Sequence, residues 1–142
     1  MAIYGSGLAK GLGITLRRLL RGPVTELYPY EHKVPPGSSR TFLAMHVTEE
    51  GAPACRACNT CIVGCPDRVL RLTKDPDDSR RPLEFVVNSG RCTFCGICVE
   101  DCTYGALYFT QEYERATTDR STLIYRLVAD GQATREGGEA KT

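Results

Sequence analysis

All eight cysteines of this chain lie between Cys55 and Cys102, in two runs with the same spacing. The first run reads CRACNTCIVGCP and the second reads CTFCGICVEDCT, so both follow the pattern CxxCxxCxxxC. Cysteines gathered in this way can form disulfides or bind metal. A disulfide framework usually spreads its cysteines to join distant loops, whereas neighbouring CxxC pairs close only very short loops. The spacing therefore favours a metal site.

Zinc and iron–sulfur clusters compete for sites with four thiolates. Structural zinc usually takes one CxxC pair and a second pair from a dozen or more residues away. Here a third cysteine follows the second at once, and CxxCxxCxxxCP is the run typical of bacterial [4Fe–4S] ferredoxins. A cubane presents iron at four corners, and a short loop with a cysteine every third residue can reach three of them. The two runs therefore predict two [4Fe–4S] clusters, with a zinc-binding interaction module as the alternative.

The fourth ligand of each cluster must come from elsewhere in the chain. In two-cluster proteins it is the last cysteine of the other run. This rule predicts two crossed ligand sets. The first set is Cys55, Cys58, Cys61 and Cys102, and the second set is Cys92, Cys95, Cys98 and Cys65. Because each cluster would join both runs, cluster binding is expected to be part of folding, and the apo chain is expected to fold poorly.

The segments around the runs predict the elements that position the clusters. The two halves form an internal repeat with an offset of 37 residues. A polar, turn-forming loop is predicted at 74–82. Short apolar or β-rich strands are predicted at 69–73, 83–87 and 106–110. This pattern predicts an α+β fold, with a bacterial-type 2[4Fe–4S] ferredoxin-like domain at residues 51–112.

The N-terminal segment, residues 1–22, is predicted to form an amphipathic helix. At about 100° per residue, its leucines fall on one side and most of its basic residues on the other. The leucines are Leu8, Leu12, Leu16, Leu19 and Leu20, and the basic residues are Lys10, Arg17 and Arg21. Three glycines weaken such a helix in isolation. Residues 8–21 are therefore expected to dock on a membrane surface or a partner subunit, with packing on the chain's own domain as the alternative.

Three further segments flank the predicted domain. Residues 23–50 contain several prolines and no helical period, so we expect an extended docking arm. Residues 113–128 mix charged and apolar side chains and are expected to form a C-terminal contact segment. Residues 129–142 have little apolar content and are expected to be a disordered tail. Arms of this length favour a chain embedded in a larger assembly over a soluble ferredoxin.

Composition narrows the classes of function. The net charge of +1 does not suggest binding to nucleic acid. No stretch approaches the roughly 20 apolar residues of a transmembrane helix, and the N-terminus lacks a signal-peptide pattern, so a cytoplasmic protein is expected. No glycine-rich nucleotide-binding loop is present, and every cysteine is assigned as a ligand. We therefore expect an electron-transfer protein with no catalytic site of its own.

Both flanks carry motifs beyond the cysteine runs. These read GLGITLRRLLRGPVTELYPYE near the N-terminus, SRTFLAMH before the first run and QEYERATTDRSTLIY after the second. Together with the runs they cover about residues 8–128 and resemble the two-[4Fe–4S] ferredoxin-like subunit of respiratory complex I, the peripheral-arm subunit nearest the membrane. Thr103 departs from the family pattern, which usually has proline after the last cysteine.

The resemblance implies a subunit that relays electrons in an assembly of the NADH:quinone oxidoreductase type. Its partners would be the other subunits of the complex, including the one that holds the quinone-proximal cluster. Its place would be the cytoplasmic face of the cell membrane, with residues 8–21 at the membrane edge. The alternative is the equivalent relay subunit of a membrane-bound [NiFe] hydrogenase or a ferredoxin-linked complex.

Overall fold

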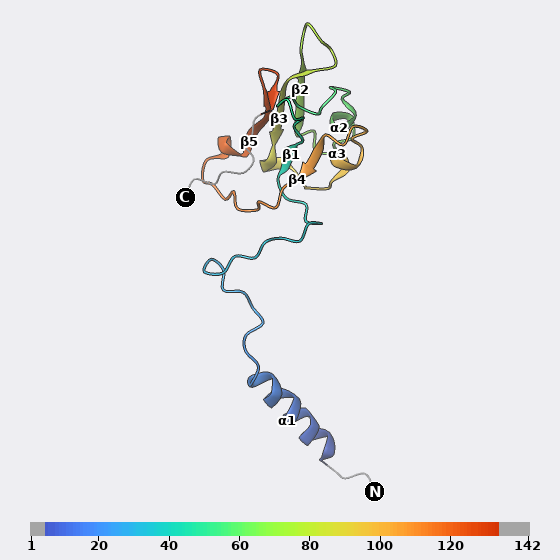
Figure 1. The fold of residues 1–142 in the computed structure, drawn as a ribbon. Coiled ribbons are helices and arrows are strands. Elements are labelled where there is room, and N and C mark those ends of the chain that lie inside the picture. The colour runs from blue at the N-terminus through green and yellow to red at the C-terminus, as the bar shows by residue number, and fades with distance from the viewer. Residues whose placement is uncertain (1–4, 134–142) are drawn as a thin grey trace. The chain divides into compact units, whose positions relative to one another are not determined.

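The computed structural model describes residues 5–133, and the chain divides into two compact units, residues 1–34 and 35–142 (Figure 1). The first unit contains α1 (Ser6–Leu19), which confirms the expected N-terminal helix. Its last turn carries Arg17 and Arg18, whose positive charge suits the negative end of the helix dipole. Within the described residues, no helix combines the length and apolar character needed to cross a membrane.

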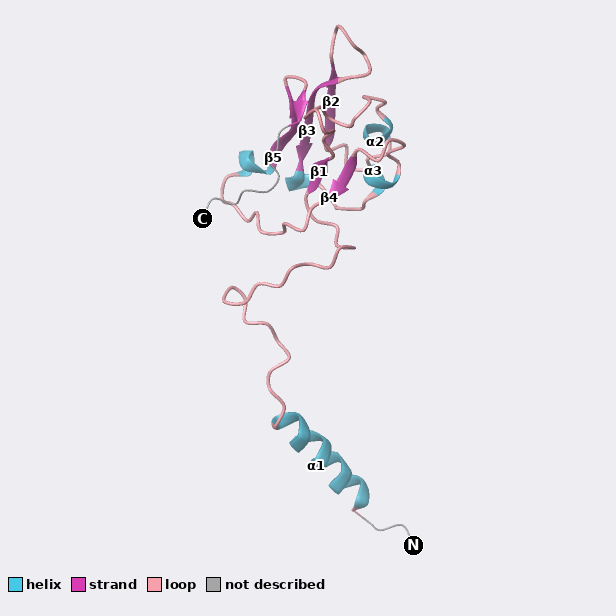
Figure 2. Ribbon diagram, in the orientation of Figure 1, coloured by secondary structure: helices cyan, strands magenta, loops and turns pink. Residues whose placement is uncertain are grey.

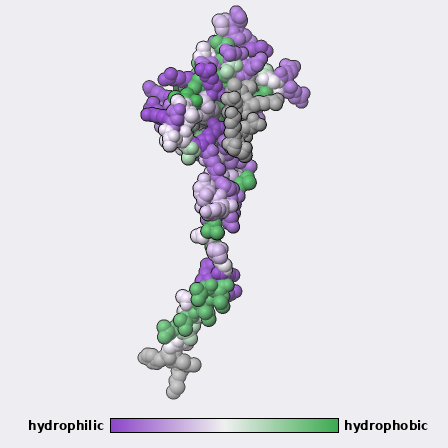
Figure 3. All heavy atoms as spheres, turned by 90° about the vertical axis from the view of Figure 1, so that its left-hand side faces the viewer, coloured by the Kyte–Doolittle hydropathy of each residue, from purple (hydrophilic) through white to green (hydrophobic). Residues whose placement is uncertain are grey.

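The side chains of α1 are all exposed within the structure. The leucines predicted to share one face are between 54% and 80% exposed, and they are Leu8, Leu12, Leu16, Leu19 and Leu20. Figure 3 shows apolar side chains gathered along this helical segment. An isolated helix of this length is marginally stable in water, so this apolar face needs a surface to contact.

The second unit is an α+β domain built from short helices and two antiparallel sheets (Figure 2). Its main elements are β1 (Leu43–Met45), α2 (Thr60–Val63), β2 (Leu70–Lys74), β3 (Pro82–Asn88), α3 (Ile97–Glu100), β4 (Leu107–Phe109), β5 (Ile124–Ala129) and β6 (Gln132–Ala133). Single 3₁₀ turns precede the second cysteine run and β5, at Ser89–Arg91 and Arg120–Leu123. β1 pairs with β4, and the other sheet has the order β2-β3-β5-β6.

The expected strands and the internal repeat are both present. β2, β3 and β4 each begin and end within one residue of the predicted ranges. The helices α2 and α3 start 37 residues apart, as do β2 and β4. The core forms where the sheets and helices meet, and Phe85, Val87 and Val128 of the central strands are almost fully buried. The two cysteine loops are thus built on a common, tightly packed support.

Three strands, β1, β5 and β6, lie in segments where the sequence predicted none. β1 falls within residues 23–50, pairs with β4 and buries all three of its residues. β5 falls largely within residues 113–128 and pairs with β3. The first residues of the expected disordered tail, 129–133, instead form the end of a hairpin between β5 and β6. Asp130 and Gly131 have positive φ angles of 50° and 74°, which suit a tight two-residue turn. Residues 134–142 lie outside the described part of the chain.

Candidate metal centre

Each cysteine run begins with a backbone turn at the same position. φ is positive at Ala57 (51°) and at Phe94 (53°), two residues that match in the repeat. The N–H of Ala57 donates to Cys55 Sγ and that of Phe94 donates to Cys92 Sγ, each at 3.4 Å. Left-handed backbone costs a non-glycine residue about 1–2 kcal/mol, so these turns need compensation. The hydrogen bonds that these turns donate to a ligand sulfur provide this compensation, in loops that wrap a cluster.

Each run then passes through a second left-handed residue into a short helix. These residues are Asn59 (φ 66°) and Gly96 (φ 87°), at the N-caps of α2 and α3. The helices carry the third cysteine of each run, Cys61 and Cys98. The positions of these two thiols are therefore fixed by hydrogen-bonded helical backbone and not by an irregular loop.

Cys102, from the second run, lies beside the cysteines of the first. Burial raises the pKa of the Cys55 thiol, and the neighbouring thiols of Cys102 and Cys58 raise it further. Burial likewise raises the pKa of Cys61 to about 12, with Cys55, Cys102 and Cys58 among the groups that add to this shift. Cys102 Sγ also accepts a hydrogen bond from the N–H of Ala106 at 3.2 Å. The structure thus brings together all four members of the first predicted set.

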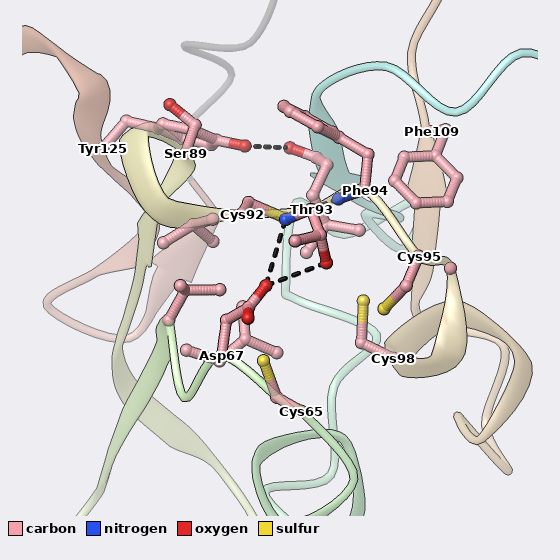
Figure 4. Close-up of a pocket in the computed structure, with 15 residues that line it drawn as sticks. Cys65, Asp67, Ser89, Cys92, Thr93, Phe94, Cys95, Cys98, Phe109 and Tyr125 are labelled. Atoms are coloured by element: carbon pink, nitrogen blue, oxygen red, sulfur yellow. Dashed lines mark hydrogen bonds between the residues drawn. The ribbon is translucent and has the colours of Figure 1, made fainter.

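Cys65, from the first run, lies with the cysteines of the second. Figure 4 shows Cys65, Cys92, Cys95 and Cys98 around one cavity, whose lining they share. Burial, together with the charges of the other three thiols, raises the pKa of Cys98 to about 11. The rest of the lining is mostly apolar and includes Leu43, Val69, Leu70, Val87, Phe94 and Phe109. The second predicted set is therefore also assembled, around a cavity with a mostly apolar lining.

The donor set fits two [4Fe–4S] clusters. All eight cysteines are free thiols. Because burial raises the pKa of several of them, they stay protonated until a positive metal centre displaces the protons. Within residues 5–133, no three side chains of His, Cys, Asp or Glu converge on a point suited to one metal ion. A cubane instead binds each thiolate at a separate iron atom, so its ligands surround a volume.

The middle cysteines of the two runs differ in their surroundings. Cys58 is exposed, and a hydrogen bond of 3.4 Å from Thr60 Oγ1 to its sulfur lowers the pKa of the thiol. Cys95 is partly buried, and Arg40 Nη1 donates to its carbonyl oxygen. Arg40 Nη2 also forms an ion pair with Glu100 Oε1 at 3.0 Å. The second loop is therefore fastened by a side chain from outside the motif, whereas Cys58 faces solvent.

The C-terminal segment closes one side of the second cavity. Tyr125, on β5, lines the cavity, and its hydroxyl donates to the carbonyl oxygen of Leu43 at 3.0 Å. The guanidinium of Arg115 lies 4.6 Å from the ring centroid of Phe42 and 5.0 Å from that of Tyr125. It is also paired with Glu112 at 2.9 Å. These contacts anchor the segment over the second set of cysteines.

Sequence analysis gave no structural role to several polar residues at this second set. They are Arg40, Asp67, Thr93 and Arg115. Three of them have a partner far along the chain, in the pairs Arg40–Glu100 and Asp67–Thr93. Arg115 pairs with the nearby Glu112 but also lies over the distant ring of Phe42. No local spacing or periodicity connects such partners, so no sequence signal could have found them.

Known proteins match this chain over most of its length. Residues 54–106 match the family model described as a 4Fe-4S dicluster domain. NADH-quinone oxidoreductase subunit I 2 of Streptomyces coelicolor is 38% identical over 136 residues, which cover 87% of this chain and 66% of that protein. NADH-quinone oxidoreductase subunit I 2 of Geobacter metallireducens is 32% identical over 120 residues, which cover 83% of this chain and 91% of that protein.

A third relative and a solved structure extend the comparison. NAD(P)H-quinone oxidoreductase subunit I of Gloeobacter violaceus is 34% identical over 128 residues, and this chain spans only 59% of it. A chain in the structure of the membrane-bound sulfane sulfur reductase, an archaeal respiratory membrane complex, is 33% identical with a TM-score of 0.54, covering 76% of this chain and 55% of that one. The chain thus spans about three fifths to two thirds of the Gloeobacter and Streptomyces proteins. Its identity to the Geobacter protein over nearly the whole of that relative shows that the chain belongs to the NADH-quinone oxidoreductase subunit I family and carries that family's 4Fe-4S dicluster domain.

Proposed function

We propose that this chain is an electron-relay subunit of a membrane-bound, complex I-like oxidoreductase of the NADH:quinone oxidoreductase type. The observation that carries the proposal is the meeting of cysteines from both runs in two crossed sets, in a chain of the subunit I family. The ligands are Cys55, Cys58, Cys61 and Cys102 for the first cluster, and Cys92, Cys95, Cys98 and Cys65 for the second. When bound, each [4Fe–4S] cluster takes up and passes on one electron at a time.

The chain's own residues hold the clusters and tune their surroundings. The N–H groups of Ala57, Phe94 and Ala106 donate to ligand sulfurs at 3.2 to 3.4 Å. Such hydrogen bonds stabilise negative charge on the sulfurs and favour reduction. The apolar lining of the second cavity keeps water from the site. With all eight thiols used as ligands, the chain passes electrons onward and leaves bond-making chemistry to its partners.

The proposal is tested by purifying the complex anaerobically from native membranes. We expect about eight iron and eight sulfide atoms per copy of this chain, as two four-iron clusters require, and two reduced-state EPR signals that depend on its cysteines. About two zinc atoms and no sulfide would instead identify a zinc-stabilised interaction module.

A second assembly is favoured by the match to the membrane-bound sulfane sulfur reductase. The same relay plan would then serve a complex with a different electron donor and acceptor, such as a ferredoxin-linked complex or a membrane-bound [NiFe] hydrogenase. The purified complex should be reduced by NADH if the first proposal holds. Reduction by ferredoxin or hydrogen, but not by NADH, would favour the second.

We further propose that residues 8–21 attach the chain to a membrane surface or a membrane subunit at the cytoplasmic face of the cell membrane, beside the subunit that holds the quinone-proximal cluster. The support is the leucine face of α1, which is more than half exposed at every position. Basic residues on the opposite side of such a helix suit anionic lipid headgroups or an acidic partner.

A matched pair of variants tests this attachment. Leu16 lies on the leucine face and is 54% exposed, while Ile14 lies on the basic side and is 59% exposed. Leu16→Asp should release the chain from washed membranes, whereas Ile14→Asp, an equal change in charge and polarity, should not. Equal retention of both variants would argue against attachment through the leucine face.

A further inference from the structure

Asp67 ties the two halves of the chain together at the second cavity. It lies two residues after Cys65, and its Oδ2 accepts hydrogen bonds from the backbone N–H of Thr93 at 3.1 Å and from the Thr93 hydroxyl at 2.8 Å (Figure 4). Thr93 directly follows Cys92. Since both cysteines line the same cavity, this contact, the Asp67–Thr93 clasp, fixes one thiol from each half relative to the other.

The first cysteine set has no counterpart of the clasp. The repeat offset of 37 residues places Tyr104 at the position of Asp67 and Arg56 at the position of Thr93. Both side chains are exposed and border a hollow beside Cys55. A phenol and a guanidinium cannot replace a carboxylate that accepts two hydrogen bonds, and they add no negative charge at neutral pH. The two sets therefore differ here in both a contact and a charge.

The carboxylate of Asp67 is a fixed negative charge in a largely apolar cavity. Among the described residues that line this cavity, it is the only Asp or Glu. Two cations near the second set are each held by an anion of their own, Arg40 by Glu100 at 3.0 Å and Arg115 by Glu112 at 2.9 Å. A partly buried, apolar setting screens a charge less than bulk water does. Asp67 is half-buried, so its charge acts on whatever the four thiols bind.

We propose that Asp67 is a positioning residue that holds Cys65 against Cys92 and lowers the reduction potential of the second cluster relative to the first. This inference rests on the proposed function, because it needs both clusters. The carboxylate repels an electron added at the second set, so reduction there is less favourable. The first set has Tyr104 and Arg56 at the matching positions, and the two carboxylates that border the hollow beside Cys55, Glu49 and Glu50, share it with the cations Arg56 and Arg81. The difference gives the relay a direction, since an electron shared by the two clusters rests more often on the first.

The test separates the charge of Asp67 from its hydrogen bonds. In Asp67→Asn the amide oxygen can still accept both bonds from Thr93, while the charge is lost. The full chain is loaded anaerobically with iron and sulfide, and its EPR signals are followed in a potentiometric titration. Asp67→Asn should make reduction of one cluster about tenfold more favourable, a rise of about 59 mV for a one-electron couple, and leave the other unchanged. Two unchanged potentials, with both clusters present, overturn the proposal.

Two cysteine variants show which cluster responds. Cys102→Ser should disable mainly the first set and Cys65→Ser mainly the second. In the Cys102→Ser background, Asp67→Asn should raise the one remaining potential. In the Cys65→Ser background it should leave the remaining potential unchanged. The reverse pattern would overturn the assignment of Asp67 to the second cluster.

Matched controls separate a local charge effect from a general one. Tyr104→Phe alters the residue that matches Asp67 in the first half without changing its charge. It should leave both reduction potentials unchanged. Asp77→Asn removes an equal charge from the loop between β2 and β3, away from the cavity. It should also leave both reduction potentials unchanged. A shift in Asp77→Asn equal to that in Asp67→Asn would overturn the local effect.

The positioning role has its own readout. Asp67→Ala removes charge and clasp together, so it should lose second-cluster iron to a chelator several-fold faster than Asp67→Asn. Equal rates of iron loss would overturn the positioning role. If the parent chain does not hold two clusters, the proposed function fails, and that result is distinct from either outcome for Asp67.

Discussion

The two halves of the repeat share a backbone but differ in what surrounds their sulfurs. Positive φ angles recur at three matched pairs, which are Ala57 and Phe94, Asn59 and Gly96, and Arg68 and Gly105. The residue types differ within every pair. Because left-handed backbone is costly for residues other than glycine, its recurrence at positions with unrelated side chains shows that the shape of the ligand loop is what the repeat preserves.

The surroundings of the two sets are not repeated. In the first half, Cys58 is exposed to solvent and its sulfur accepts a hydrogen bond from Thr60 Oγ1. In the second half, contacts from both ends of the domain converge, through Arg40 on one side and Tyr125 on the other. The geometry of cluster binding therefore constrains both backbones alike, while the electrostatic environment of each set depends on residues outside the repeat.

Removing the last cysteine of either run should have the largest effect, because it tests whether the halves are crossed. Cys102→Ser should abolish or degrade the first cluster, whose other predicted ligands lie in the first run, and largely spare the second. Cys65→Ser should do the reverse. Iron content and EPR of the full chain, loaded anaerobically, measure both losses.

The alternative connectivity predicts an opposite result. If each run supplied all four ligands of its own cluster, Cys102→Ser would remove the second cluster and Cys65→Ser the first. A serine at an exposed position of the connecting loop, such as Asp77→Ser, serves as the control and should retain both clusters.

Much of this domain could be predicted from the cysteine spacing alone. The runs at Cys55 and Cys92 predict their loops because a cubane restricts where four sulfurs can lie. The strand at 83–87 follows from its β-rich composition. These features depend on residues close together in the sequence, and the cysteine spacing occurs in both halves of the repeat.

Long-range contacts could not be predicted in the same way. β1 is only three residues long and is defined by its pairing with β4, more than sixty residues later in the chain. Arg40 and Arg115 are single charged residues whose partners are chosen by the tertiary fold. Periodicity describes one segment at a time, so it predicts neither which segments pair nor which charges meet.

Gly96 and its counterpart Asn59 offer a finer comparison. Both have left-handed backbone, so alanine at either position should cost about 1–2 kcal/mol or less through backbone strain. At Gly96 a Cβ would also lie 2.9 Å from Arg40 Cζ. Gly96→Ala should therefore destabilise the loaded chain more than Asn59→Ala, as measured by the guanidinium concentration at which the cluster absorbance is lost.

A double-mutant cycle isolates the contribution of Arg40. In an Arg40→Ala background the contact with a Cβ at position 96 is gone, so the added cost of Gly96→Ala should fall toward that of Asn59→Ala. If Gly96→Ala destabilises the chain equally with Arg40 and with Arg40→Ala, backbone strain alone accounts for the need for glycine at position 96. Arg40 would then fasten the second loop only through Cys95 and Glu100.

The smallest expected effect comes from the hydroxyl of Thr60, which donates to Cys58 Sγ at 3.4 Å. Thr60→Val keeps the shape of the side chain and removes the hydrogen bond, so it should lower the potential of the first cluster, since such a bond stabilises the reduced form. The shift should be smaller than that of Asp67→Asn, because a dipole at an exposed sulfur is screened more than a full charge at a cavity wall. The matching position in the second half is Ile97, and Ile97→Thr should raise the potential of the second cluster by a similar amount. If both variants move the potentials in these opposite directions, the difference between the halves can be transferred from one to the other by single side chains on a common backbone.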